Sequence, residues 1–217
     1  MVERYAREEM KKHWTQHARY AAWLEVEKAA VKAWNKLGLI PDDDCKKIVK
    51  NATFSVERIE EIEAVTKHDL IAFNTSVAES LGEESRWFHY GMTSSDAVDT
   101  GVALQMRDSL KIVIKDVKML MKSIKKRAKE HKYTLMVGRS HGIHGEPITF
   151  GLTLAVWYDE MKRHLKNLKE TLKVISVGQI SGAMGNFAHA PLELEEYAMA
   201  ELGLKPEPCS NQVVHRD

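Results

Sequence analysis

Gly138–Pro147, with the sequence GRSHGIHGEP, lies between the two longest helical patterns in the chain. From about residue 95 to 129, and again from about 148 to 175, apolar residues recur at steps of three and four, as in a helix that buries one stripe. At about 1.5 Å per residue, each helix would be roughly 40–50 Å long. The segment between them is rich in glycine and histidine. This composition favours neither helix nor strand, and we expect a bend that Pro147 ends by opening the second helix.

The two apolar stripes identify the residues that each long helix should bury. The first stripe consists of Val102, Met106, Leu110, Val113, Val117, Leu120 and Ile124. The second consists of Leu154, Tyr158, Met161, Leu165, Leu168, Leu172 and Ile175. Titratable side chains on a bend between two rigid helices suggest a functional site there.

The first 92 residues predict shorter helices. One is expected within Tyr5–Lys36, and Ser55 is suited to cap another that is interrupted near Thr66–His68. The face expected to pack in the first of these helices consists of Trp14, Ala18, Ala21, Leu24, Glu25, Lys28, Val31 and Trp34. Only Leu135–Val137 and Val177–Ile180 are weak strand candidates. The predicted fold class is therefore all-α, with a small helical domain over residues 1–92 and long bundle helices over residues 93–217.

Composition limits the kind of protein. Of the 217 residues, 44% are hydrophobic, which is enough to form a hydrophobic core. The chain has 32 basic and 31 acidic residues, so its formal net charge is +1. We therefore expect no nucleic-acid partner. Two cysteines, a charged N-terminus and the absence of a run of about 18 apolar residues predict a cytoplasmic protein with neither a disulfide framework nor a membrane span.

Thr93-Ser94-Ser95-Asp96 opens the first long helix and has two interpretations. Ser, Thr and Asp commonly cap a helix by accepting the free N–H groups of its first turn. A helix N-terminus with neighbouring hydroxyls also binds anions such as a carboxylate or a phosphate. Both interpretations stay open from these residues alone.

Three other segments could carry chemistry, and each has an ordinary explanation. Lys67-His68-Asp69 is also typical of a charged helix surface. His141 and His144 have a spacing seen in metal sites, but zinc needs three or four ligands and the other histidines and cysteines are far away in sequence. We therefore expect no metal site. Arg4 and Tyr5 are also typical of a solvated chain end.

Taken together and in this order, RY at 4–5, TKHD at 66–69, GMTSSD at 91–96, GRSHGIHGEP at 138–147 and SNQ at 210–212 resemble the adenylosuccinate lyase family of the fumarase/aspartase superfamily. The resemblance extends over all 217 residues. Argininosuccinate lyases and fumarases carry Gln where this chain has His144, and they lack the TKHD segment. Ser140 stands where the family usually has Thr, and Gly145 where Ala is common; because both are small, we expect His141 to keep its place.

The resemblance implies an elimination that splits a C–N bond and releases fumarate, without a cofactor. The substrates implied are the purine-biosynthetic nucleotides adenylosuccinate, which gives AMP, and succinylaminoimidazole-carboxamide ribotide, which gives AICAR. The reaction removes a weakly acidic proton beside a carboxylate while an amine leaves. Negative charge therefore grows on that carboxylate, and fixed donors aimed at it lower the barrier.

The resemblance also implies roles for individual residues. His141 would be the general acid, since a histidine titrates near neutral pH. Thr93 and Ser94 would bind a succinyl carboxylate. The other implied substrate contacts are Lys67, His68 and Asp69, which orient the substrate and balance its charge, Arg4 and Tyr5, which hold its 5′-phosphate, and Gln212, which binds through its amide. No role is assigned to His89 or His144.

One expected part of the family is missing from the chain. The family's general base is a serine on a mobile loop with a Met-Pro-Lys-Arg-Asn-like signature, which nothing here matches, and the chain ends at Val-Val-His-Arg-Asp. We therefore expect an N-terminal half that is inactive alone, and uncovered stripes that drive association with further copies, as in the superfamily's homotetramers. Two alternatives remain: another fumarate-releasing lyase of the superfamily, and a non-catalytic helical-bundle interaction module.

Overall fold

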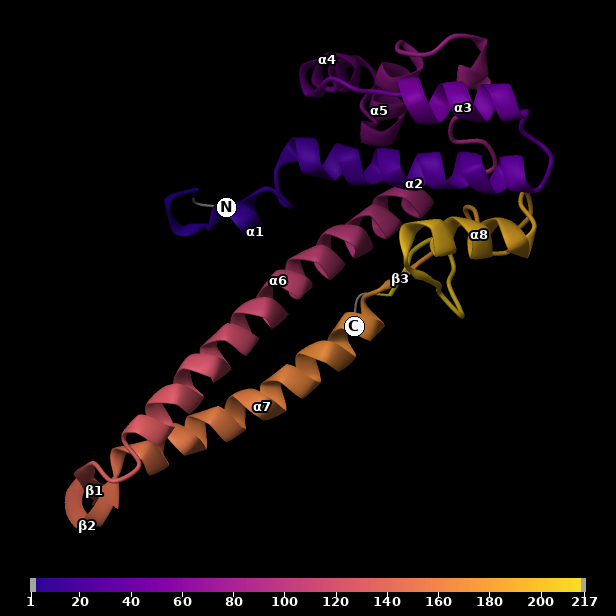
Figure 1. Cartoon of the computed structure of the whole chain (residues 1–217). Helices are drawn as coiled ribbons and strands as arrows, with labels where there is room; N and C mark the ends of the chain where they lie inside the picture. The colour runs from indigo at the N-terminus through magenta and orange to yellow at the C-terminus, as the bar shows by residue number, and fades with distance from the viewer. Residues whose placement is uncertain (1–2, 216–217) are drawn as a thin grey trace. The chain divides into compact units, whose positions relative to one another are not determined.

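The computed structural model describes residues 3–215, and its chain divides into two compact units (Figure 1). Unit 1 consists of Met1–Asp108 and Ile175–Asp217, and unit 2 of Ser109–Val174. Helix α6 (Ser94–Glu130) begins in unit 1 and continues into unit 2. Helices dominate the described residues and the only sheets there are two small two-stranded ones, which confirms the all-α prediction. Within the same residues, no helix has the length and apolar content that a membrane crossing requires.

Unit 1 is built around helix α2 (Gln16–Lys36), which packs against α3 and α8. Its other elements are the 3₁₀ turns η1 (Glu3–Tyr5) and η2 (Glu83–Trp87), the helices α1 (Glu8–Lys11), α3 (Asp42–Asn51), α4 (Val56–Thr66), α5 (Asp69–Ala78) and α8 (Leu192–Leu202), and the paired strands β3 (Val177–Gly178) and β4 (Lys205–Pro206). The break between α4 and α5 confirms the interruption expected near Thr66–His68.

An aromatic cluster forms the centre of unit 1. Tyr20 stacks on Phe73, and Trp23 meets Phe73 edge to face at 5.5 Å between ring centroids. All three side chains are at most 1% exposed, so their burial is a large part of the stabilising free energy. Gly101 of α6 lies directly against Trp23, where a Cβ would come within 2.8 Å of the ring. The glycine therefore allows α6 to approach α2 closely.

The predicted packing face of the first helix was partly right, since Val31 and Trp34 are buried and four other members are half-buried. Trp14 lies before α2 and is 43% exposed, and Glu25 is exposed. The residues that α2 buries are Tyr20, Ala22, Trp23, Val26, Glu27, Ala29, Ala30, Val31, Ala33 and Trp34. This set extends around much of the helix because α2 packs against other helices on more than one side, so a single apolar stripe does not describe it.

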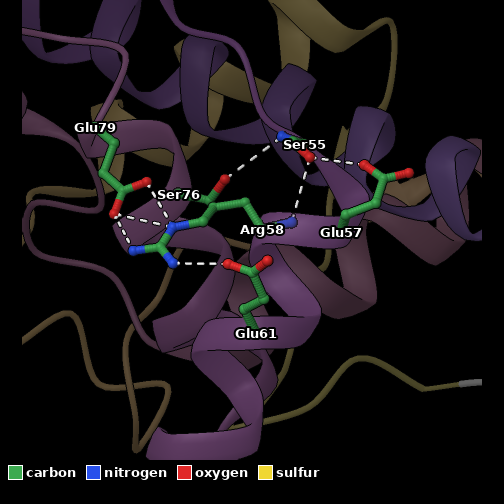
Figure 2. A network of polar contacts seen from close by, with 6 residues as sticks. All are labelled: Ser55, Glu57, Arg58, Glu61, Ser76 and Glu79. Carbon is green, nitrogen blue, oxygen red and sulfur yellow. Dashed lines mark hydrogen bonds and ion pairs between the residues drawn. The ribbon is translucent and has the colours of Figure 1, made fainter.

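A polar network fixes the turn that precedes α4 (Figure 2). Ser55 caps α4 as predicted, because its Oγ accepts the N–H of Arg58 at 3.2 Å. The Ser55 hydroxyl also donates to Glu57, which lowers the pKa of that carboxyl. The Arg58 guanidinium binds Glu79 beyond α5 through Nε and Nη2, and Glu61 through Nη1. The network thus ties the two helices that flank Lys67–Asp69.

Unit 2 is a pair of helices joined by a β-hairpin, shown at the tip where α6 and α7 meet (Figure 1). Strands β1 (Leu135–Ser140) and β2 (Ile143–Thr149) pair antiparallel and lead into α7 (Phe150–Val174). The expectation that Gly138–Pro147 forms neither helix nor strand was therefore wrong, as was the placement of Pro147 at the start of a helix. Pro147 lies in β2, which is tolerated because this two-stranded ribbon consists only of edge strands.

Unit 2 has almost no core of its own. Among its described hydrophobic side chains, only Ile114 and Leu154 are buried. The predicted α7 stripe is correct in direction, since its members within the helix are buried or half-buried, while the other α7 residues are exposed apart from Phe150, Gly151 and Thr153. Between α6 and α7 lies a groove of about 690 Å³ that is lined by Lys111, Ile114, Lys115, Lys118, Met119, Lys122, Lys169 and Leu172.

Candidate functional site

The start of α6 leaves two hydroxyl groups available. Thr93 precedes the helix and Ser94 is its first residue. The N–H of Asp96 bonds to the Thr93 carbonyl oxygen at 3.0 Å, and not to the Thr93 hydroxyl. Within residues 3–215, neither the Thr93 nor the Ser94 hydroxyl has a hydrogen-bond partner. The capping interpretation therefore does not account for them, and both can donate to a ligand.

Asp96, the last residue of the Thr93–Asp96 segment, makes contacts that the sequence did not reveal. Its carboxylate is 0% exposed and accepts N–H groups from Thr93, Ser181 and Gly182 at 2.9–3.2 Å. Burial raises the pKa of Asp96 above its ordinary value, while these three donors and nearby His89 act in the opposite direction. The residue joins the head of α6 to a segment 85 positions further along the chain.

The segment that contains Ser181 and Gly182 also contacts the segment that contains Gln212. The side-chain amide of Gln179, which is 0% exposed, donates to the Gln212 carbonyl oxygen at 2.6 Å. The hydroxyls of Ser181 and Ser210 lie 3.2 Å apart. Gln212 itself is exposed. Residues 179–182 therefore connect the head of α6 with residues 210–212, two predicted parts of the site.

A buried ion pair lies in the neighbourhood of Asp96. The His89 ring contacts Glu27 at 2.6 Å, and the Glu27 carboxylate also accepts the His89 N–H. Burial lowers the pKa of His89, but the charge and hydrogen bond of Glu27, together with Asp96, outweigh it and the net pKa is raised. His89 adopts a left-handed backbone conformation with φ of 62°. No sequence pattern links residues 62 positions apart, so this pair was missed.

The TKHD segment forms the junction between α4 and α5. Lys67 ends α4 in a left-handed conformation, with φ of 55°. His68 caps α5, because its Nδ1 accepts the N–H of Ile71 at 3.3 Å. Asp69 is the first residue of α5 and accepts the N–H of Leu70. Two of the three predicted contact residues thus have a local structural role, and Lys67 and His68 are exposed.

Arg4 and Tyr5 form an exposed pair in η1. The Arg4 guanidinium lies over the Tyr5 ring, 4.8 Å from its centroid. Tyr5 is 76% exposed. Arg4 is exposed as well, so its guanidinium can donate to an oxyanion such as a phosphate.

His141 occupies the tip of the hairpin in unit 2. His141 and Gly142, the two residues between β1 and β2, have φ of 54° and 74°, as in a type I′ turn. A histidine there is in a sparsely populated region of backbone space, which is a feature of functional sites. The pairing of the strands is irregular at Gly138, where a Cβ would strike the Glu146 carbonyl oxygen. His141 is exposed, and His144 lies exposed on β2 opposite Arg139.

A family model described as Lyase matches residues 3–217. The chain belongs to this lyase family. It is 65% identical over 217 residues to the adenylosuccinate lyase of Helicobacter pylori (strain ATCC 700392 / 26695), and 50% identical over 217 residues to that of Bacillus subtilis (strain 168). These matches cover 100% of the chain and 49% and 50% of the two relatives, so it spans about half the length of the curated relatives it matches.

Two solved structures share the fold of this chain over about half of their own length. The fumarate lyase from Mesorhizobium sp. BNC1 superposes with a TM-score of 0.87 at 27% identity, covering 94% of this chain and 49% of that one. The 3-carboxy-cis,cis-muconate lactonizing enzyme from Pseudomonas putida superposes with a TM-score of 0.81 at 26% identity, covering 92% and 48%.

The predicted site residues of this lyase-family chain are divided unequally between the two units. Eight of the nine belong to unit 1: Arg4, Tyr5, Lys67, His68, Asp69, Thr93, Ser94 and Gln212. His141 alone belongs to unit 2. Hydrogen bonds within unit 1 connect Thr93 with Gln212 through residues 179–182, whereas no hydrogen bond or ion pair in the described residues joins either of them to Arg4 or to Lys67–Asp69. Within residues 3–215, no three His, Cys, Asp or Glu side chains form a group that could hold a metal ion.

Proposed function

We propose that the protein carrying this chain is an adenylosuccinate lyase. It would eliminate fumarate from adenylosuccinate, giving AMP, and from succinylaminoimidazole-carboxamide ribotide, giving AICAR, in purine biosynthesis. The observation that carries the proposal is the 65% identity to a curated adenylosuccinate lyase over the whole chain. The free hydroxyls at the head of α6 and the exposed histidine at a left-handed turn fit the two chemical tasks of the reaction.

Those two tasks are stabilising the carboxylate and protonating the leaving amine. Thr93 and Ser94 would donate hydrogen bonds to a succinyl carboxylate, and the N-terminus of α6 adds a favourable field for negative charge. His141 would act as the general acid toward the leaving nitrogen, a role that typically contributes 10²–10⁴-fold, as an order of magnitude. Its exposure within unit 2 fits a group that meets a substrate bound elsewhere.

The remaining predicted residues would hold the nucleotide. Arg4 and Tyr5 would bind the 5′-phosphate, and Lys67, His68 and Asp69 would orient the substrate and balance its charge. Gln212 would bind through its amide. Residues 1–92 would act as one functional domain that supplies the phosphate contacts, and residues 93–217 as the first part of the central bundle.

We propose a cytoplasmic homotetramer in which active sites combine residues from several copies. Two features support association. The α7 stripe is only half-buried, and many apolar side chains of unit 2 are exposed, including Leu152, Val156 and Trp157. Unit 2 also carries 15 basic against 6 acidic residues, whereas unit 1 carries 17 against 25. Opposite charges favour contacts between unit 2 of one copy and unit 1 of another.

The test uses the complete protein, in which these 217 residues are followed by the second half that the relatives have. Joining residues 1–217 to the second half of the Helicobacter pylori relative provides such a protein. We expect fumarate release from adenylosuccinate, a loss of about 10²–10⁴-fold in His141→Gln, and no turnover by the 217-residue chain alone, which lacks the serine loop. Turnover by the chain alone, or none by the complete protein, would contradict the proposal.

A second lyase function differs only in the amine that leaves. The exposed Arg4 favours a nucleotide substrate, because its guanidinium is available for a phosphate. In the complete protein, Arg4→Ala should raise the KM for adenylosuccinate at least about tenfold, the order expected when a charge-assisted hydrogen bond is lost. Arg7→Ala is the matched control, since Arg7 pairs with Glu9. Equal KM values in the two variants would favour the other lyase.

A further inference from the structure

Asp96 contacts two parts of the chain that are distant in sequence. Its Oδ2 accepts the N–H of Thr93 at 2.9 Å and that of Gly182 at 3.2 Å, and its Oδ1 accepts the N–H of Ser181 at 3.2 Å. The side chain is completely buried. A helix cap needs only one of these three bonds, so Asp96 does more than begin α6.

The contacts at Thr93 are half of a capping box. In a complete box, the side chain at the helix start accepts an N–H from the third helical residue, whose own side chain accepts an N–H in return. Asp96 makes the second of these bonds. The first is absent, because the Asp96 N–H bonds to the Thr93 carbonyl oxygen. The helix is thus capped without using the Thr93 hydroxyl.

The segment held by Asp96 has an open side. Gly182 has φ of +80°, and a Cβ on it would meet nothing within 4 Å. Gly185, with φ of +70°, lies against the backbone of Ser210 and Asn211. The 182–185 turn is therefore fixed at both ends, by Asp96 and by the segment before Gln212, with open space where a side chain at residue 182 would project.

We propose that Asp96 is a positioning residue for the elimination, which makes this inference rest on the proposed function. By taking over the capping of α6 and binding the 181–182 backbone, it keeps the Thr93 hydroxyl free and fixed. The ligand that this hydroxyl would meet is a dicarboxylate such as fumarate. Asp96 does not touch this ligand, and it acts through Thr93.

A double-mutant cycle in the complete protein tests the inference. Fumarate inhibition is measured for Asp96→Asn, Thr93→Val and the double variant. Asn keeps the shape of Asp but presents an N–H₂ group where Oδ2 accepted two bonds. Each single change should raise the fumarate inhibition constant about tenfold. The double variant should also raise it about tenfold and not about a hundredfold, because the two changes remove the same interaction.

Asp99→Asn is the matched control. Asp99 is also a buried carboxylate of α6, one that accepts the N–H of Val214 at 3.1 Å. Its effect should be additive with that of Thr93→Val. If the complete protein releases fumarate normally and the effects of Asp96→Asn and Thr93→Val on fumarate inhibition are additive, this inference alone is overturned. Absence of any fumarate release would overturn the proposed function, and this inference with it.

Thermal unfolding decides the case in which Asp96→Asn fails to fold. Because the Thr93 hydroxyl is not used by the helix, Thr93→Val should leave the melting temperature unchanged while it weakens fumarate inhibition. Thr15→Val is the comparison, since the Thr15 hydroxyl caps α2 by accepting the N–H of Ala18, and it should lower the melting temperature. If Thr93→Val lowers the melting temperature as much as Thr15→Val and leaves fumarate inhibition unchanged, Thr93 is only a helix cap.

Discussion

Units 1 and 2 are made of similar helices but are stabilised differently. Unit 1 contains all of the largest fully buried side chains among the described residues, with Trp23, Tyr20 and Phe73 at its centre. Unit 2 buries two hydrophobic side chains, and its other hydrophobic side chains are half-buried or exposed. The two also have opposite formal charges. The difference indicates that unit 1 has a core of its own, whereas unit 2 has almost none.

The largest expected effect comes from emptying the core of unit 1. Phe73→Ala removes a completely buried ring and should lower the free energy of unfolding by about 3–5 kcal/mol, measured by urea denaturation of the chain. Trp157→Ala in unit 2 is the matched control. Because Trp157 is 51% exposed, it should change the free energy of unfolding by less than about 1 kcal/mol, but weaken self-association in sedimentation. Equal losses of stability would contradict the distinction between the units.

A buried carboxyl in unit 1 should make stability depend on pH. Burial, the largest cause, raises the pKa of Glu195 to about 7, helped by Asp96 and Glu207, while the N–H of Ile180 lowers it. Because the folded pKa lies above the ordinary 4.5, this stabilisation is complete below pH 4.5 and is lost as the pH rises through 7. The loss should be about 3 kcal/mol, and it should be absent in Glu195→Gln.

Urea denaturation of both proteins from pH 5 to 8 measures this difference. The pKa values of Asp96 and His89 are also raised, so their contributions to stability also fall as the pH rises. Both residues are present in both proteins. The gap between the two curves therefore reports Glu195. Parallel curves over this range would show that the carboxyl is not held in the protonated form.

Unit 2 should be most sensitive where its hairpin joins its helices. A Cβ on Gly151 would lie 2.6 Å from the Ala128 carbonyl oxygen and 2.8 Å from that of His131. Gly151→Ala should therefore cost about 1–3 kcal/mol, seen as faster hydrogen exchange of the β1 and β2 amides. Gly145→Ala is the control, because its nearest neighbour would be 3.7 Å away and no loss is expected. Unchanged exchange in Gly151→Ala would disprove the close approach.

The smallest effect is expected at the hairpin tip. The left-handed conformation of His141 costs about 1 kcal/mol, and the greater chain entropy of glycine costs about 0.5–1 kcal/mol, so His141→Gly should change stability by less than about 0.5 kcal/mol. His141→Val should instead destabilise the hairpin, since a β-branched residue disfavours positive φ. Hydrogen exchange of the hairpin amides compares the two. A marked loss in His141→Gly would mean that the imidazole supports the fold.

Patterns with a single period predicted the buried faces only in part. The α7 stripe followed the less exposed side of that helix, whereas the stripe of the first long helix included the exposed Val113 and Leu120. The buried face of α2 was predicted only in part, because four of its buried residues are alanines, which give little amphipathic signal. The weak strand candidate Leu135–Val137 lies in β1, but the rest of the hairpin was missed. Gly138–Pro147 lacks a continuous β-branched alternation, and its strands arise from pairing with each other across a two-residue turn.

The site was predictable only where it is local. The Thr93–Asp96 segment could be identified as a helix start, and Ser55 as a cap, because capping depends on neighbours in sequence. The donors that Asp96 receives from residues 181 and 182 depend on the tertiary fold, as does the contact of Glu27 with His89. Buried carboxylates of this kind have no sequence period, so they become visible only in the folded chain.

Unit 1 is discontinuous in sequence, which affects how it forms during synthesis. Residues 175–215 supply completely buried side chains such as Leu194 and Met199, yet they leave the ribosome after all of unit 2. At roughly 5–20 residues per second, the nascent chain waits several seconds with an unfilled core. During that delay Asp96 lacks its donors from residues 181 and 182, Asp99 lacks its donor from Val214, and both carboxylates stay hydrated. Completion of the first unit is thus a late event in translation, and until then its apolar interior is a target for chaperones.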